Sequence, residues 1–245
     1  MMKILVTGAT GYIGGRIIPR LVEQGEEVSV LVRDPKRVEG REWYDKVRVI
    51  QGDLLEGDGD WAQQIQGFDA AYYLVHSMYA GQKFRDLDKT CAWNFAKAAK
   101  GGIGHVIYLG GLQPRGADAS AHLGSRAETG AILRESLPVT ELRAGPIIGS
   151  GSASFEMVRY LTERLPVMVA PKWILNEVQP IAVRDILNYL LSALEKEPLG
   201  VVDVGMEPLT FREMMHRYAA ERGQRRVIIP LPVLTPNLAA RWVGL

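Results

Sequence analysis

The sequence lacks three features that would each point to a particular class of protein: several cysteines, a long apolar run and an excess of charge of one sign. One cysteine, Cys91, among 245 residues excludes an internal disulfide framework and a cysteine-cluster metal site. No run approaches the ~18 consecutive apolar residues of a membrane helix, and the N-terminus lacks the apolar core and cleavage site of a signal peptide. The 29 basic and 28 acidic side chains nearly cancel, which disfavours a protein that coats nucleic acid. These absences predict a cytoplasmic protein with no membrane span and no nucleic acid partner.

The residues up to about Gly145 alternate short β-branched runs with helical patterns. Strands are expected at Lys3–Thr7, Val28–Val32, Val47–Gln51, Ala70–Val75, His105–Leu109 and Val139–Leu142, and helices at Tyr12–Gln24, from Phe84 to Ala98 and near Ala121–Glu135. Pro19 lies inside the first helix, where Gly15 can ease a local kink. The alternation predicts an α/β fold, a doubly wound parallel sheet of the Rossmann type.

The alternation of strands and helices ends after about Gly145, where small residues and prolines become frequent. We expect residues 1–150 to form the Rossmann core and residues 151–245 a smaller C-terminal lobe that completes the cleft and can return a strand to the core sheet. Within it, helices are expected at Phe155–Leu165, Asp185–Leu194 and Phe211–Arg222, and a strand at Val201–Val204.

The most informative segment is the glycine loop between the first strand and the first helix. Gly8 permits a tight turn, Gly11 lets a pyrophosphate approach the backbone, and Gly14 lets the helix pack on the sheet. The helix N-terminus then offers free N–H groups to the phosphates. This context favours a dinucleotide site over a ligand-free turn, and a nucleotide triphosphate loop is disfavoured because no Gly-Lys-Ser/Thr follows.

The end of the second strand bears on which dinucleotide is preferred. Arg33 takes the expected selecting position, with Arg37 one helical turn later, and a guanidinium can hold a 2′-phosphate. This favours NADP over NAD. In the alternative, both arginines are solvated and Asp34 caps the turn before Pro35 or faces the ribose, which would leave NAD possible.

Asp53 and Leu54 follow the third strand. Asp53 is expected to reach the adenine amino group while Leu54 packs on the ring, or Asp53 is a capping aspartate that needs no ligand.

Seven segments together resemble the short-chain dehydrogenase/reductase superfamily in its extended and atypical branches. They are T-G-A-T-G-Y-I-G at 7–14, V-R-D at 32–34, G-D-L at 52–54, Y-L-V-H-S-M at 73–78, Y-L-G-G-L at 108–112, L-R-A-G-P-I-I-G at 142–149 and Q-P-I-A-V-R-D at 179–185. The resemblance covers essentially the whole chain and is greatest to NmrA-like bacterial NAD(P)H-binding proteins. A further domain often follows in that group, so a short member or a truncated chain is expected.

The resemblance implies a set of cofactor contacts at the carboxyl ends of the strands. They are Gly8, Thr10, Gly11, Tyr12, Ile13, Gly14, Arg33, Asp53, Leu54, Leu74, Val75, His76, Gly110 and Gly111. Ligands of open α/β sheets bind at this edge.

The chain departs from the superfamily at its proton relay. Active members carry a Tyr-x-x-x-Lys pair and an upstream hydroxyl, but here the helix reads His122-Leu-Gly-Ser-Arg126, and the hydroxyl position falls on Gly110 and Gly111. His122 can act as acid or base or be structural, and Arg126 can contact the cofactor but cannot act as a base. The site can also bind the dinucleotide without turning it over.

Other polar residues are weaker candidates. Ser77 and Tyr79 can offer hydroxyls to a substrate, and the serines of 149–154 can cap the next helix or bind an anion. Trp173, Gln179 and Pro180 are expected to face the cleft. The histidines at 76, 105 and 216 have no ligand spacing, so no metal site is predicted.

Two hypotheses remain open. The first is an NADP(H)-dependent oxidoreductase acting on a small organic substrate, and the second is a non-catalytic NADP(H)-binding redox sensor or assembly module. The glycine loop supports both equally, and the sequence identifies neither the substrate nor the oligomeric state.

Overall fold

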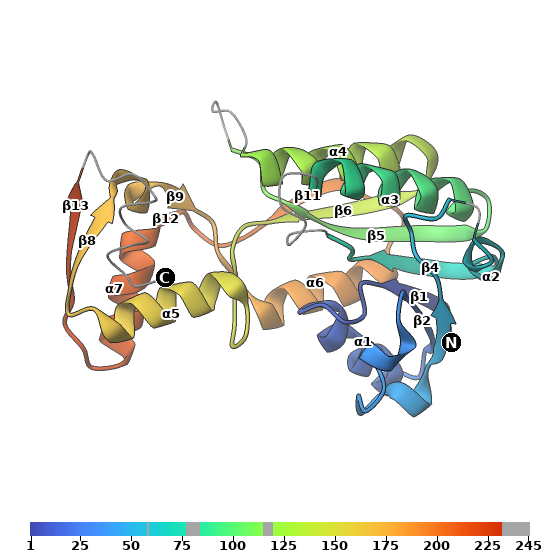
Figure 1. Ribbon diagram of the computed structural model, residues 1–245, viewed down its shortest axis with the longest axis horizontal. Helices are drawn as coiled ribbons and strands as arrows, with labels where there is room; N and C mark the ends of the chain where they lie inside the picture. Colours follow the sequence, from blue (N-terminus) through green and yellow to red (C-terminus); the bar gives the residue numbers. More distant parts are fainter. Residues whose placement is uncertain (58, 77–83, 115–119, 232–245) are drawn as a thin grey trace. The chain divides into compact units, whose positions relative to one another are not determined.

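The computed structural model of the chain describes residues 1–57, 59–76, 84–114 and 120–231, and it divides into two compact units (Figure 1). The first unit comprises residues 1–144 and 184–204, and the second comprises residues 145–183 and 205–245. The division at residue 150 that the sequence suggests would assign residues 184–204 to the C-terminal lobe, whereas here they belong to the first unit. Those residues supply one helix and one strand to the first unit.

The first unit is built on a seven-stranded sheet in which every neighbouring pair of strands is parallel. Its spatial order is β11-β6-β5-β4-β1-β2-β3. The strands are β1 (Lys3–Thr7), β2 (Glu27–Val32), β3 (Arg48–Gln51), β4 (Phe68–Tyr73), β5 (Ile103–Gly111), β6 (Val139–Ala144) and β11 (Gly200–Val204). The predicted doubly wound parallel sheet is confirmed.

Helices cover both faces of this sheet, with α3 and α4 on one face and α1 and α6 on the other (Figure 1). Their bounds are α1 (Gly14–Glu23), α2 (Trp61–Gln64), α3 (Phe84–Ala99), α4 (Ala121–Ser136) and α6 (Val183–Leu194), with short 3-10 turns η1 (Pro35–Arg37) and η2 (Tyr44–Lys46). Successive residues of a strand face opposite sides. Accordingly, Tyr73 packs on Phe95 of α3 with ring centroids 5.0 Å apart, whereas the buried Tyr72 hydroxyl donates to the Leu190 carbonyl of α6 at 2.9 Å.

Helix α1 continues through Pro19, as expected from the sequence. A proline within a helix removes one N–H and crowds the carbonyl four residues earlier, which here belongs to Gly15. Tight packing on the sheet offsets this cost, because Ile17, Ile18 and Leu21 are fully buried.

A buried carboxylate lies between β6 and α4. Glu141 is fully buried and pairs with Arg134 of α4 and with Arg143 of its own strand, the latter at 2.8 Å. Its side chain fills the space beside two glycines: a Cβ atom at Gly110 would lie 2.9 Å from Glu141 Oε1, and one at Gly130 would lie 2.4 Å from Oε2. A side chain at position 110 would therefore collide with Glu141, which explains the glycine there.

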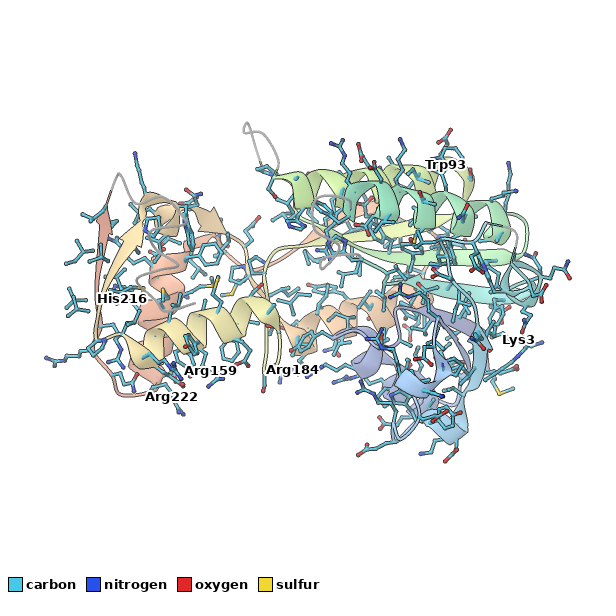
Figure 2. The ribbon with its side chains drawn as sticks, in the orientation of Figure 1. Lys3, Trp93, Arg159, Arg184, His216 and Arg222 are labelled. Atoms are coloured by element: carbon cyan, nitrogen blue, oxygen red, sulfur yellow. The ribbon has the colours of Figure 1, made fainter. Side chains whose placement is uncertain are left out.

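The second unit has its own small core. Its helices are α5 (Ala153–Arg164), η4 (Lys172–Leu175) and α7 (Phe211–Glu221), and its short strands are β7 (Ile147–Ile148), β8 (Val167–Pro171), β9 (Glu177–Val178), β10 (Ile181–Ala182), β12 (Leu209–Thr210) and β13 (Val227–Leu231). Glu163 of α5 accepts from the Tyr218 hydroxyl of α7 at 2.5 Å and pairs with Arg159 at 3.2 Å and Arg222 at 3.7 Å (Figure 2). These contacts tie α5 to α7.

The pairing of β8 with β13 was not expected from the sequence. The strands are parallel, with Ala170 opposite Pro230 and Pro171 opposite Leu231. Proline cannot donate to a sheet, but both strands of a two-stranded sheet are edges, where proline is tolerated. Among the residues that the structure describes, each helix is too short or too polar to serve as a transmembrane span.

Glu141→Gln tests whether the buried carboxylate supports the first unit. Removing its charge leaves Arg134 and Arg143 partly buried without their counter-ion, so we expect unfolding free energy to fall by about 3 kcal/mol in urea titrations. Glu135→Gln, an exposed change on α4, should stay within about 0.5 kcal/mol of the original protein. Equal stabilities of the two variants would contradict this assignment.

Candidate functional site

The expected cofactor residues gather around the point where the strand order of the sheet reverses. Strand β1 lies between β4 and β2, so connections run in opposite directions from it, and ligands of such sheets bind at the carboxyl ends beside this point. Thr7 joins the two strand ends: its hydroxyl donates to the Tyr72 carbonyl at 3.1 Å and accepts from the Leu74 N–H at 3.2 Å. The end of β4 is therefore held against the start of the glycine loop.

The glycine loop is packed too closely for side chains at two of its glycines. Gly8 has a φ of +72°, and a Cβ atom there would lie 2.5 Å from the Leu74 carbonyl oxygen. A Cβ atom at Gly14 would lie 2.3 Å from the Gly8 carbonyl oxygen, whereas one at Gly11 would lie 3.1 Å from it. The turn is closed by a hydrogen bond from the Gly11 N–H to the Gly8 carbonyl at 2.9 Å.

The start of α1 is suited to an anion. No side chain caps the helix at Ile13, and its first turn holds no acidic residue. Arg16 adds a cation beside the loop: its guanidinium donates to the Tyr12 carbonyl at 3.1 Å and lies 3.8 Å from the centroid of the Tyr12 ring. Helix N-termini of this kind attract phosphate groups, because their N–H groups and dipole favour negative charge. Thr10 completes the loop and is partly exposed.

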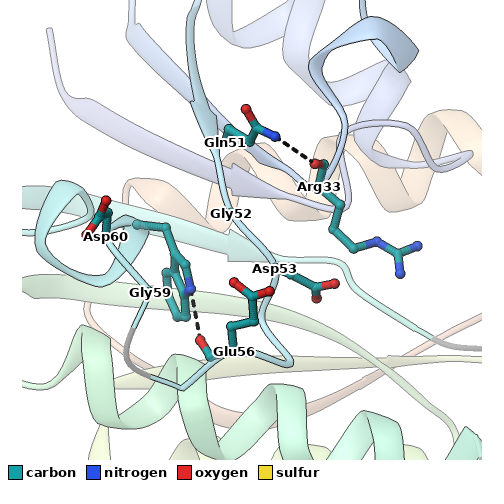
Figure 3. Close-up of a pocket in the computed structure, with 8 residues that line it drawn as sticks. Arg33, Gln51, Gly52, Asp53, Glu56, Gly59 and Asp60 are labelled. Atoms are coloured by element: carbon teal, nitrogen blue, oxygen red, sulfur yellow. Dashed lines mark hydrogen bonds between the residues drawn. The ribbon is translucent and has the colours of Figure 1, made fainter.

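Arg33 and Asp53 line one pocket beyond the ends of β2 and β3 (Figure 3). It has a volume of about 360 Å³, and its other lining residues are Gln51, Gly52, Glu56, Gly59, Asp60 and Trp61. Arg33 is exposed, and its carbonyl accepts from Gln51 at 3.5 Å. Asp34 instead caps the η1 turn, since its carboxylate accepts from the Lys36 N–H at 3.1 Å.

Asp53 and Leu54 follow β3 in a tight turn. The Asp53 carboxylate accepts from the Leu55 N–H at 3.0 Å, so it holds this turn and does not cap a helix. The Leu54 side chain belongs to the hydrophobic core beneath α3, and the Asn94 amide donates to its carbonyl at 2.8 Å. The segment is thereby held rigidly beside the pocket.

The segment after β4 belongs to a hydrogen-bonded group that no motif of the sequence indicates. His76 Nδ1 lies 2.7 Å from Asp88 Oδ2 of α3, and the Ser125 hydroxyl of α4 donates to the same oxygen at 3.0 Å. The Asp88 side chain is 3 % exposed and that of His76 is 15 % exposed. One signal for Asp88 existed: it falls one turn after Phe84 and one turn before Cys91, on the otherwise apolar stripe of the helix.

His122 and Arg126 lie on α4 beside this group. The His122 ring stacks on Phe84 with centroids 4.4 Å apart, and it meets His76 edge-on at 6.2 Å. A Cβ atom at Gly111 would lie 2.7 Å from Leu123 and 3.2 Å from the Arg126 side chain, so α4 occupies the space at the end of β5.

Two nearby nucleophilic or acidic groups are held neutral. Burial raises the pKa of the Cys91 thiol to about 12, with nearby Asp53 and Asp88 adding to the effect. Burial also raises the pKa of Tyr108 to about 12, and its hydroxyl donates to the Arg126 carbonyl at 3.0 Å. Neither group exchanges a proton readily near neutral pH.

The remaining candidates fall elsewhere. Ser152 caps α5, because its hydroxyl accepts from the Phe155 N–H at 3.2 Å, and this confirms the capping alternative. Trp173, Gln179 and Pro180 belong to the second unit. Ser77 and Tyr79 lie outside the described residues.

Among the described residues, no cluster of three or more His, Cys, Asp or Glu side chains could hold a metal ion.

Comparison with known families agrees with this geometry. Residues 8–137, just over half of the chain, match a family described as NAD(P)H-binding. The chain belongs to this NAD(P)H-binding family. The resemblance to the short-chain dehydrogenase/reductase superfamily is confirmed, while the NmrA-like subgroup stays a prediction.

Three similar proteins illustrate the relationship. A Synechocystis protein named "Putative dihydroflavonol 4-reductase" is 26 % identical over 89 % of this chain, which spans only 63 % of that relative. A ceramide reductase of Caulobacter vibrioides is 26 % identical over 99 % of this chain and 78 % of its own. The structure of the Bordetella bronchiseptica enzyme WbmH in complex with NAD+ shares the fold with a TM-score of 0.74 and 17 % identity, covering 98 % of this chain and 91 % of that one.

Gly14→Ala tests the packing of the glycine loop. Its new methyl group would collide with the Gly8 carbonyl and force the turn open, so we expect NADPH and NADH binding to weaken by at least about tenfold in calorimetric titrations. Gly15→Ala is the matched control, because its Cβ atom would meet only the Ala9 carbonyl at 3.6 Å, and it should bind as the original protein does. Equal binding by both variants would show that the loop does not hold the dinucleotide.

Proposed function

We propose that the protein is an NADP(H)-dependent oxidoreductase that interconverts a small organic carbonyl compound and its alcohol. The observation that carries the proposal is the loop of Gly8, Gly11 and Gly14, placed between β1 and α1 at the reversal point of the sheet, in a chain of an NAD(P)H-binding family. The dinucleotide supplies a hydride equivalent when bound. The glycine loop would hold its diphosphate, with Tyr12 and Ile13 at the helix start.

Two observations favour carbonyl reduction over the other reactions of similar folds. The two relatives from Synechocystis and Caulobacter vibrioides, which match 89 % and 99 % of this chain, are both named as reductases. The site also has titratable side chains, His76 and His122, close to the end of β4, where the family pattern places the nicotinamide-side ribose. Leu74, Val75, Gly110, Gly111 and Arg126 would border that end of the dinucleotide.

Arg33 supports a preference for NADP over NAD. It lines the pocket at the end of β2, and Asp34 is already engaged in capping the next turn. A guanidinium at this place suits a 2′-phosphate, while an acidic side chain would suit a free ribose. Asp53, which lines the same pocket, would face the adenine.

The alternative is a module that binds NADP(H) without turnover. The substitution of His122 and Arg126 for the usual tyrosine and lysine favours it, since Arg126 cannot act as a base. Both functions require dinucleotide binding and differ only in catalysis.

The two functions are separated by mixing purified protein and NADPH with a panel of aldehydes and ketones. We expect NADPH to bind and its reduced nicotinamide absorbance to fall with at least one member. Binding without any turnover would favour the non-catalytic module, and absence of binding to either dinucleotide would refute both proposals.

Arg33→Asp tests the dinucleotide preference. Loss of charge-assisted hydrogen bonds to a 2′-phosphate should weaken NADPH binding by about tenfold or more, with a much smaller change for NADH. Arg225→Asp, an exposed position in the second unit, makes the same charge change and should affect neither. Equal weakening of NADPH and NADH in the Arg33 variant would contradict the assignment.

A further inference from the structure

We propose that His76, oriented by the buried carboxylate of Asp88, donates and accepts the proton of the reaction in place of the missing tyrosine. This inference rests on the proposed oxidoreductase function and identifies the group that completes it. Asp88 and Ser125 are positioning residues, since they act through the imidazole ring.

The hydrogen bonds around Asp88 select the orientation of the ring. Its Oδ2 atom lies 2.7 Å from His76 Nδ1 and accepts from the Ser125 hydroxyl at 3.0 Å, at a side chain that is 3 % exposed. A buried carboxylate is stable only when donors face it, so Nδ1 carries a proton directed at Oδ2. The other ring nitrogen, Nε2, is then the one that can exchange a proton with a ligand.

The position of His76 relative to the glycine loop fits this role. Leu74, two residues earlier, is held by Thr7 and lies so close to Gly8 that a Cβ atom there would be 2.5 Å from the Leu74 carbonyl oxygen. The strand end that carries His76 is therefore in contact with the loop assigned to the diphosphate. The His76 side chain is 15 % exposed, so a ligand can reach it.

Other acid or base candidates around this strand end are less suited. The raised pKa values of Tyr108 and Cys91 keep both groups neutral, and burial likewise raises the pKa of Tyr73. Arg126 cannot release a proton near neutral pH. His122 stacks on Phe84 and presents its ring to His76, and it is the competing candidate that an experiment must separate.

In the reduction direction, the carbonyl group gains a C–H bond and an O–H bond. As the carbonyl carbon receives a hydride equivalent, the C–H bond forms and the π electron pair moves to oxygen. The oxygen takes the Nε2 proton of the His76 imidazolium, which gives the alcohol and a neutral ring. Asp88 stays ionised and keeps the Nδ1 proton in place, and the ring regains a proton from water.

The experiment compares His76→Gln, Asp88→Asn, His122→Gln and the control His216→Gln, whose site is an exposed position of α7 in the second unit (Figure 2). For each variant we measure NADPH affinity and then steady-state turnover with the aldehyde and ketone panel. We expect His76→Gln to lose about 10²–10⁴-fold in kcat, far more than it loses in NADPH affinity, with little change in KM. Asp88→Asn should lose less in kcat, and His216→Gln nothing.

A second measurement does not depend on activity. Heteronuclear NMR of the histidine ring nitrogens should show neutral His76 protonated on Nδ1, and Asp88→Asn should weaken this preference. A neutral His76 protonated on Nε2 would overturn the inference.

The remaining outcomes also decide the question. Normal turnover in His76→Gln, or loss confined to His122→Gln, would overturn the assignment of His76 and leave the oxidoreductase function standing. NADPH binding without turnover of any carbonyl by the original protein would refute the oxidoreductase function and the role of His76 with it, and failure to bind either dinucleotide would refute dinucleotide binding itself.

Discussion

The site depends on a close contact between the first turn of α1 and the Gly8 carbonyl. This contact leaves no room for a Cβ atom at Gly14. A Cβ atom at Gly14 would lie 2.3 Å from that oxygen, and one at Gly8 would lie 2.5 Å from the Leu74 carbonyl oxygen. The helix start, the end of β1 and the end of β4 are therefore held at van der Waals distance from one another. Because Thr7 also bridges β1 and β4, the N–H groups of α1 and the residues after β4 occupy fixed positions at one edge of the sheet.

The features that could be predicted from the sequence are those with a local physical cause. Strand β1 matches its expected bounds, Lys3–Thr7, because a short apolar run ends at a glycine that needs a positive φ. The parallel, doubly wound sheet follows from alternating strands and helices, since right-handed crossovers leave few topologies, whereas the order of its seven strands is known from the structure alone. Helix ends were less predictable: α1 begins at Gly14 and not at Tyr12, because the loop turn uses the residues before it.

The features that could not be predicted depend on contacts between distant residues. Strand β13 pairs with β8 across about sixty residues, and prolines in both segments conceal the strands from a local pattern. Gly110 appeared from the sequence as a missing catalytic hydroxyl, yet the Glu141 side chain occupies the space beside it. The group of His76, Asp88 and Ser125 comes from β4, α3 and α4, and no spacing rule connects these three positions.

Two buried carboxylates among the described residues of the first unit, Glu141 and Asp88, differ in the kind of partner that they have. Glu141 is compensated by Arg134 and Arg143, whose guanidinium groups keep their charge at any physiological pH, so this cluster has one charge state and serves packing. Asp88 faces an imidazole and a hydroxyl, and the imidazole is a donor that can itself gain or lose a proton. The charge of Asp88 is thereby linked to a ring that keeps contact with solvent. A carboxylate that serves stability alone gains nothing from a partner that can lose its proton. Because Asp88 has such a partner and Glu141 does not, we expect proton transfer at the end of β4.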